Sequence, residues 1–393
     1  MVNANFYNIE LRDKNGLLQN YITPWCSEPN WEWNRIGGCG NCRLKIRKDY
    51  RNIRFNARDD IQIRIRSGST SKLVYRGWVL APTHSLKIPE EMSIQIKGYF
   101  DLLDYKIVHD AGDTKTYSNM SISAIVEDII DNFVVGNTPI TKGTIDVANF
   151  SVDTIDFDRD TVSGALRTLA ELEGNVEYGV DENLVFFWRK ESTTLKHKFF
   201  VGYDVASLER KIDWSKLVNK VYFEGGKVNG ATYLKSAGAD DSQNRYFLVE
   251  DVLVNSAITT DSVASQYINS TLKEKSKISI ILRAKIPNTS LRLEDSIPLG
   301  RIAIYDKDYD QSLYKWGKTA SGGDNLIWGR GIYSGSDAIW GALFKDQVDK
   351  ISYSLSETED KFNLELTTGG SLLNTAARIK QLELITNNLR QRS

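Results

Sequence analysis

Three cysteines are the residues of this chain whose type and spacing could do chemistry. Cys39 and Cys42 form a Cys-x-x-Cys pair, and Cys26 precedes them. Two thiolates held this close together can bind zinc or form a redox disulfide. Zinc needs a fourth ligand, and the nearest histidine in the sequence is His84. Because the pair leads into a predicted strand rather than a helix, we favour free thiols beside a glycine-rich bend, with a metal site on Cys26, Cys39 and Cys42 as the alternative.

Other signatures of enzyme active sites are missing from the sequence. Histidine occurs only at positions 84, 109 and 197, which does not suggest a metal hydrolase or a His-based triad. Carboxylates such as Asp156, Asp158 and Asp160 are abundant, but abundance alone does not define a glycosidase. The sequence contains no Walker-type phosphate loop, no Gly-x-Ser-x-Gly and no His-Glu-x-x-His. We therefore predict a protein that is not an enzyme and has no cofactor.

Residues 43–66 are strongly basic, although the whole chain nearly balances 50 basic against 51 acidic residues. Phosphate contact is one interpretation of this segment. The alternation of charged and apolar residues favours another, in which the cations form the solvated face of strands. The basic residues are Arg43, Lys45, Arg47, Lys48, Arg51, Arg54, Arg58, Arg64 and Arg66.

The composition is that of a folded protein of two or three domains. The chain has 393 residues, 41% of them hydrophobic and 26% charged. A net charge of −1 gives no general attraction for nucleic acid or an anionic membrane. No apolar run approaches the roughly 18 residues of a membrane span, and the first residues lack a signal-peptide core. Three cysteines are too few for a disulfide framework and fit a reducing compartment.

Alternation with a period of two predicts antiparallel strands at 43–47, 61–66, 73–80 and 92–97, which we expect to enclose one core. The period then becomes helical. Helices are predicted from Ser121 to Phe133 and from Thr161 to Gly174, with Ser121 as an N-cap, and a hairpin follows at 176–187. Further on we predict a strand at 217–226, a loop at 229–244, a helix at 262–275 and β structure from 279 to about 368, which closes on a hairpin at 351–366.

These elements predict a mainly β fold with α+β inserts, in which two small antiparallel β-barrels are interrupted by α/β domains and followed by a short C-terminal helix. The predicted divisions are a first barrel at 1–115, an α/β insert at 116–200, a second barrel at 201–230 and 279–370, an α/β insert within it at 231–278, and the C-terminal helix at 371–393.

Two further patterns lie near the C-terminus. Trp-Gly recurs at Trp316, Trp328 and Trp340, which suggests hairpins that pack on the adjacent barrel or, alternatively, an aromatic platform for sugar or protein. After residue 370, apolar residues follow heptad spacing over fewer than three heptads. The segment predicts either a trimeric interchain bundle or a terminal helix folded onto its own domain. Its candidate trimerisation residues are Leu372, Ile379, Leu382, Ile385 and Leu389.

Taken in order, several stretches resemble the baseplate hub, or tail-tip hub, proteins of tailed bacteriophages. They are also similar to the N-terminal part of contractile-injection spike proteins. The resemblance covers nearly the whole chain to residue 370 but includes neither the Trp-Gly repeat nor the cysteine pair. The stretches that carry it are the strand block from Trp33 to residues 94–103, the insert 161–187, the segment 213–226, and the hairpin 351–366 before Gly369-Gly370.

The resemblance implies a homotrimer in the virion, at the tail tip or baseplate, made in the host cytoplasm. Two similar barrels per chain would build a pseudo-sixfold ring that joins the sixfold tail tube to a threefold tip. The implied partners are the tail tube or distal tail protein ring, a tip, spike or fibre protein, and the tape-measure protein. DNA would pass through the lumen transiently, without specific binding.

Two other functions stay open. The tryptophan repeat and the tyrosine content fit a carbohydrate-binding, host-recognition module of the tail. The chain could instead be the structural part of a tail-associated, peptidoglycan-degrading protein, although it lacks recognisable hydrolytic chemistry.

Overall fold

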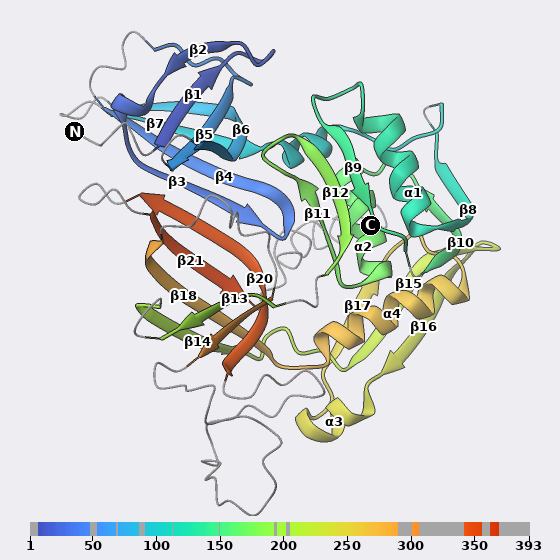
Figure 1. The fold of residues 1–393 in the computed structure, drawn as a ribbon. Helices are drawn as coiled ribbons and strands as arrows, with labels where there is room; N and C mark the ends of the chain where they lie inside the picture. The colour runs from blue at the N-terminus through green and yellow to red at the C-terminus, as the bar shows by residue number, and fades with distance from the viewer. Residues whose placement is uncertain are drawn as a thin grey trace, which may run out of the picture.

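The computed structural model shows a mainly β chain whose helices gather on one side (Figure 1). Among the residues it describes, no helix combines the length and apolar character that crossing a bilayer requires. The Trp-Gly repeat and the predicted helix at 371–393 lie outside these residues. The described residues are 7–47, 53–67, 70–85, 91–111, 113–148, 150–191, 195–201, 205–289, 301–305, 342–355 and 362–368.

Seven N-terminal strands form one antiparallel sheet. They are β1 (Tyr7–Arg12), β2 (Leu18–Tyr21), β3 (Cys26–Asn34), β4 (Ile36–Arg47), β5 (Asp60–Ser67), β6 (Thr70–Ser85) and β7 (Glu91–Gly98). Their order is β2-β1-β5-β6-β7-β4-β3. Alternate apolar side chains, such as Ile9, Ile63 and Ile94, are buried in a common core. The four strands predicted in this region are therefore confirmed, and so is the single core that the period of two implied.

Six C-terminal strands of the described chain continue this sheet through β3. They are β13 (Leu195–Phe200), β14 (Ser207–Asp213), β18 (Ser279–Thr289), β19 (Arg301–Tyr305), β20 (Ala342–Leu355) and β21 (Phe362–Thr368). We call β1–β7 the first sheet and these six strands the second sheet, although the pairing of β3 with β20 makes the two continuous. β20 pairs with β3, with Ile351 opposite Trp33 and Tyr353 opposite Trp31, and the predicted hairpin of β20 and β21 is confirmed. The main path of this sheet runs from β14 to β2, whereas β19 and β13 branch from it at β20, and the described strands close no barrel. The mainly β prediction is thus confirmed, and the two barrels stay a prediction.

Helices and shorter strands follow β7, as the change of period predicted. They are the 3-10 helix η3 (Tyr99–Tyr105), β8 (Lys115–Ser121), α1 (Ile122–Ile129), the π-helical turn η4 (Ile130–Val134), β9 (Thr141–Ile145), β10 (Ser151–Phe157), α2 (Val162–Glu173), β11 (Val176–Val180) and β12 (Val185–Lys190). Ser121 Oγ accepts a hydrogen bond from Ala124 N and caps α1. Thr161 caps α2 in the same way, and Gly174 ends it with φ at 68°. Both predicted helices and the β11–β12 hairpin are confirmed.

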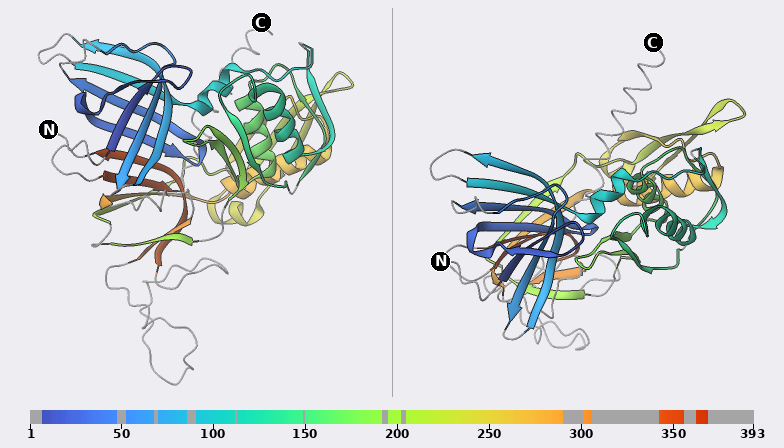
Figure 2. Two further views of the ribbon diagram at one scale, coloured as in Figure 1. Left: turned by 45° about the horizontal axis from the view of Figure 1, so that its top comes forward. Right: turned by 90° about the horizontal axis from the view of Figure 1, so that it is seen from above.

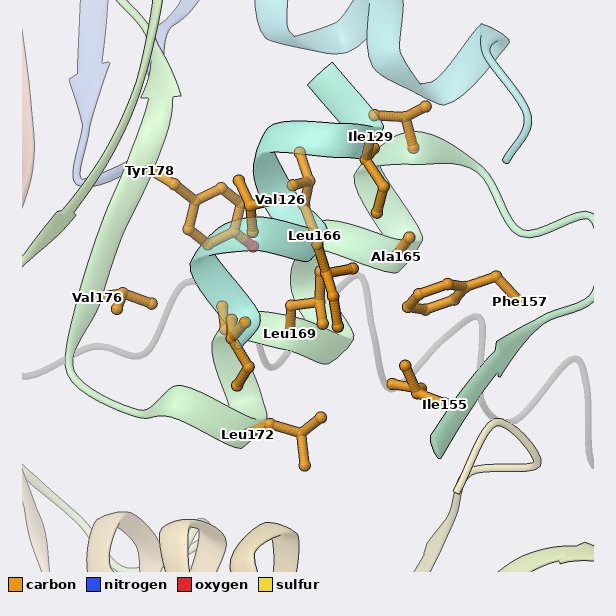
Figure 3. Close-up of a cluster of buried hydrophobic side chains, with 14 of the residues drawn as sticks. Val126, Ile129, Ile155, Phe157, Ala165, Leu166, Leu169, Leu172, Val176 and Tyr178 are labelled. Atoms are coloured by element: carbon orange, nitrogen blue, oxygen red, sulfur yellow. The ribbon is translucent and has the colours of Figure 1, made fainter. Parts of the chain in front are cut away.

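The core of this region lies between its helices and strands (Figure 3). Leu166 and Leu169 of α2 face the α1 side chains in the close-up, while Phe157 and Tyr178 approach from β10 and β11. These side chains are buried because each helix has one apolar face at helical spacing.

A third group of elements packs on the same core. It consists of β15 (Lys220–Val228), β16 (Ala231–Gly238), α3 (Asp240–Tyr246), β17 (Glu250–Val254) and α4 (Asp261–Lys275). β15 pairs antiparallel with β16 and parallel with β17, and its Phe223 ring lies 5.6 Å from the Tyr267 ring of α4. β15 therefore belongs to this sheet, whereas the sequence-based division had assigned residues 201–230 to the second barrel. We call residues 99–191 and 217–276 together the α/β half.

The predicted loop at 229–244 is wrong, because β16 and α3 occupy most of it. β16 is an edge strand whose side chains alternate between exposed and half-buried, and none of them is fully buried. Its sequence, ATYLKSAG, therefore lacks the row of large apolar residues by which buried strands are recognised. The helix predicted at 262–275 is confirmed as α4.

The packing of α2 on α4 makes stability depend on pH through Glu171. This carboxylate accepts a 2.8 Å hydrogen bond from Tyr267 Oη. Burial raises the pKa of Glu171, while the Tyr267 hydrogen bond and the Arg167 charge oppose that rise. The folded chain therefore keeps this proton to a higher pH than the unfolded chain, and ionisation costs stability as pH rises from about 4.5 through the raised pKa.

For Glu171→Gln we expect a difference in free energy of unfolding that moves in favour of the variant as pH rises through this interval. Glutamine resembles the protonated carboxyl and accepts the same hydrogen bond from Tyr267 without the cost of a buried charge. Urea unfolding of both proteins at a series of pH values measures the difference. A difference that stays constant from acid to neutral pH would contradict the assignment.

Candidate functional site

The three cysteines lie together in the N-terminal core. Cys39 and Cys42 are both within β4, opposite Trp33 and Trp31, and between these pairs one residue of β3 faces two residues of β4. Cys26 begins β3 and faces Ile46. All three thiols are free, and each is at most 4% exposed. The Cys-x-x-Cys spacing is thus part of an irregular strand pairing and does not form a tight ligand turn.

Burial raises the pKa of all three thiols well above the ordinary value. The thiolate form, which binds metals and attacks disulfides, is therefore disfavoured at neutral pH. Among the described residues, no group of three or more His, Cys, Asp or Glu side chains is arranged to hold a metal ion. The three cysteines therefore act as small apolar side chains that fill the core.

We expect a soluble thiol reagent such as an aromatic disulfide to leave Cys26, Cys39 and Cys42 unmodified in the native protein. All three should react together when the N-terminal sheet unfolds, because they share one core. The release of the coloured thiol, followed with and without urea, checks this. Fast modification of one cysteine in buffer alone would show an accessible thiolate and overturn the core assignment.

The predicted basic segment is partly neutralised within the chain. On the outer face of β1, Arg12 donates two hydrogen bonds to Glu10 Oε2, at 2.9 and 2.7 Å. Arg64 Nε of β5 lies 3.4 Å from Glu10 Oε1. Arg43 Nε donates instead to Ser93 Oγ at 3.1 Å. Arg64 is thus compensated within the sheet by Glu10, which is buried, while Arg43 is exposed.

A second buried carboxylate fixes the point where the chain leaves the first sheet. Asp60 is 1% exposed and accepts hydrogen bonds from Arg76 Nε at 3.0 Å, Gln62 Nε2 at 2.9 Å and Tyr99 Oη at 2.9 Å. Tyr99 begins η3, the first element of the α/β half. The hydrogen bonds to Asp60 therefore fasten the start of this half to β5 and β6.

Arg35 connects three parts of the fold. It lies between β3 and β4, and its backbone N donates to Asp349 O of β20 at 2.8 Å. Its Nε lies 2.8 Å from Asp349 Oδ1, and its Nη1 donates to Glu191 Oε1 at 2.7 Å. Burial disfavours the charge, but Asp349, Glu191 and Glu177 outweigh it and raise the pKa of Arg35. One guanidinium thus joins the first sheet, the second sheet and the end of the β11–β12 hairpin.

Glu177 extends this junction. It is 1% exposed on β11, accepting from Gln347 Nε2 of β20 at 2.7 Å and from Arg189 Nε of β12 at 3.0 Å. The Arg189 guanidinium also lies 4.6 Å from the centre of the Phe187 ring, which stacks on Trp33 of β3. We call Arg35, Glu177, Glu191, Gln347 and Asp349 the junction cluster.

Glycines allow the backbones of the two regions to meet at the same place. β11 pairs in parallel with β4, with Gly179 opposite Gly37 and Val180 opposite Gly38. Gly38 has φ at +74°, and a Cβ there would lie 2.1 Å from Val180 O. Only glycine fits this conformation and this distance without displacing β11. The α/β half is therefore joined to the first sheet by backbone pairing as well as by the junction cluster.

A hollow of about 600 Å³ opens beside the β3–β20 pairing. Its lining includes Trp31, stacked on Tyr353 with ring centres 5.1 Å apart, and Glu32, which pairs with Lys350 Nζ at 2.5 Å. The Glu32 carboxylate that lines this hollow thus holds β3 to β20. It connects two strands, as the polar side chains of the junction cluster do.

Sequence reasoning singled out the cysteines and the basic segment, and it missed the junction cluster. The cluster residues come from β11, β20, and the segments next to β3 and β12, so no local spacing relates them. The glycine signal was present, since Gly37 and Gly38 precede the cysteine pair and Gly179 lies within a predicted strand. The candidate trimerisation residues and most of the C-terminal patterns lie outside the described residues.

Three solved structures share this fold over nearly their whole length, whereas neither a family model nor a curated protein matches the sequence. The 43 kDa tail protein of prophage MuSo2 from Shewanella oneidensis is 11% identical, with a TM-score of 0.59 over 92% of this chain and 97% of that one. The tail protein of Neisseria meningitidis MC58 is 10% identical, with a TM-score of 0.62 over 93% and 97%. Prophage tail protein gp18 of Listeria monocytogenes EGD-e is 10% identical, with a TM-score of 0.53 over 95% and 98%.

Proposed function

We propose that this chain, which has the fold of these three phage tail proteins, is a structural protein of a bacteriophage tail and is located in the virion. The observation that carries the proposal is the extent of the match, at least 92% of this chain and 97% of each neighbour. A match confined to one sheet would support only a shared module, because folds are reused for many functions. Here the sheets and the α/β half match together.

The more specific role is that of a baseplate or tail-tip hub. The described chain contains two sheets joined end to end by β3 and β20, with the α/β half beside them (Figure 2). Two such units per chain, each completed to a barrel, would give six units in a homotrimer. A ring of this kind can match a sixfold tail tube, or a distal tail protein ring, on one side and a threefold tip, spike or fibre protein on the other.

The junction cluster supports a structural role. Its charges, and those around Asp60 and Glu10, form ion pairs that hold strands together. A catalytic site would instead present a nucleophile and a base to a cavity. We propose that the protein is not an enzyme and that the tape-measure protein and then DNA pass through the lumen of the ring. The pairing of Arg64 with Glu10 supports a lumen that does not bind DNA tightly, since each free cation would add a salt-sensitive phosphate contact.

Native mass spectrometry of the purified full chain tests the oligomeric part of this proposal. A trimer is expected. Deleting residues 371–393 removes the heptad residues Leu372, Ile379, Leu382, Ile385 and Leu389, and should weaken the trimer without abolishing it if ring contacts supply most of the association energy. A stable monomer, or a closed dimer, would contradict the hub.

A further inference from the structure

An aromatic knob projects at the end of α3, where the α/β half meets the segment that follows β14. It consists of Trp214, Tyr246, Phe247 and Leu248. Phe247 is 87% exposed, and Trp214 and Leu248 are both more than half exposed. The Trp214 and Tyr246 rings meet edge to face with centres 5.9 Å apart, and the Arg245 guanidinium lies over Tyr246. Trp, Tyr and Arg are the side chains that most often dominate binding at protein interfaces.

The fold holds this knob in a strained conformation. Phe247 has φ at +63°, which is unfavourable for a residue with a Cβ. The fully buried Asn219 fixes the turn, because its Nδ2 donates to Phe247 O at 2.6 Å and its Oδ1 accepts from Val249 N at 2.7 Å. Strain that buried hydrogen bonds maintain, with the aromatic side chain directed to solvent, is typical of a preorganised contact surface.

A hollow of complementary character lies elsewhere on the same half. It has a volume of about 520 Å³ and follows η3 and η4. Its apolar lining residues are Tyr105, Ile107 and Phe133, of which the first two are 67% and 48% exposed. Its ionisable lining residues other than Tyr105 are Lys106, His109 and Arg159. The hollow therefore offers apolar contacts from Tyr105, Ile107 and Phe133 together with the positive charges of Lys106 and Arg159.

From these observations we infer that the knob of one copy of this chain occupies the hollow of the next copy. The first turn of α3 carries Asp240 and Asp241, both exposed, which complement Lys106 and Arg159. Figure 1 shows α3 and α1, which leads into η4, at opposite ends of the α/β half. A contact between opposite ends is head-to-tail and can close into a ring. The inference rests on the proposed trimer and names the contact on its rim.

The variant Phe247→Gly should remove the inferred contact between copies without destabilising the fold. Glycine accepts a φ of +63° without strain, so the variant should melt at the same temperature as the parent or higher. Loss of the aromatic anchor should weaken self-association about 30-fold in sedimentation equilibrium. Leu17→Ala is the control, because Leu17 is 70% exposed but lies in the first sheet, and it should leave association unchanged. Unchanged association of Phe247→Gly would overturn the inference.

Crosslinking tests the geometry directly. Ile107→Cys and Phe247→Cys, combined in one chain, should give covalent oligomers up to the trimer with a short bismaleimide, because the native cysteines are buried. An equimolar mixture of the two single variants should give crosslinked dimers, and either single variant alone should give none. A trimer in sedimentation without these crosslinks would overturn the contact and leave the ring standing. A monomer throughout would overturn both.

Discussion

Arg35→Ala is expected to reduce the free energy of unfolding by about 3–5 kcal/mol, because it leaves the buried carboxylate of Asp349 and the partly buried carboxylate of Glu191 without their cation. Asp349 would lose the contact with Nε at 2.8 Å, and Glu191 the hydrogen bond from Nη1 at 2.7 Å. Glu177 would lose a favourable charge nearby. Because the guanidinium connects both sheets and the β11–β12 hairpin, the loss should also loosen the α/β half relative to the sheets. Urea unfolding gives the free energy, and hydrogen exchange of the β11 amides reports the loosening.

Lys350→Ala is the matched control for this prediction. Lys350 also bridges the two sheets, through Glu32 at 2.5 Å, but both side chains are more than a quarter exposed. Removing a pair of this kind typically costs up to about 1 kcal/mol, because water solvates the remaining charge. If the two variants lost equal stability, burial of the junction cluster would not be what makes Arg35 important.

Gly38→Ala is expected to have an effect at least as large, about 4 kcal/mol or more, or to prevent accumulation of folded protein. The new Cβ would lie 2.1 Å from Val180 O, and this oxygen belongs to the backbone that pairs β11 with β4. Neither strand can move away without breaking that pairing. Thermal unfolding and the yield of soluble protein measure the outcome.

Gly136→Ala is the control that measures the cost of backbone strain alone, without the close contact that a Cβ would make at position 38. Gly136 has φ at +77°, almost equal to that of Gly38, but a Cβ there meets nothing within 4 Å. This variant should lose only about 1–2 kcal/mol, the cost of a left-handed conformation with a Cβ. A similar loss in both variants would show that contact with β11 adds nothing at Gly38.

Local signals predicted α1, α2 and α4 and about half of the described strands, but not α3. Ser121 caps α1 as predicted, since an N-cap needs only a side chain and a backbone N–H three residues on, and Thr161 caps α2 in the same way. The alternating strands were visible because each faces one core. β16 was missed because, as an exposed edge strand, it carries no fully buried row.

Long-range contacts could not be predicted in this way. Arg35 and Glu191 are 156 residues apart, and Lys350 and Glu32 are separated by 318. No periodicity relates such positions, and an arginine between two strands ordinarily suggests only a solvated turn. The cysteine pair was the opposite case, because its spacing suggested chemistry while the core around it keeps the thiols protonated.

An electron-microscopic reconstruction of the purified full chain would show whether it forms the hub of a phage tail. We expect a threefold ring with a central hole, two sheet units per chain around the lumen, and the α/β half on the outside, with Phe247 of each copy against Ile107 of the next. A compact monomer, or an assembly without a central channel, would contradict the proposed hub.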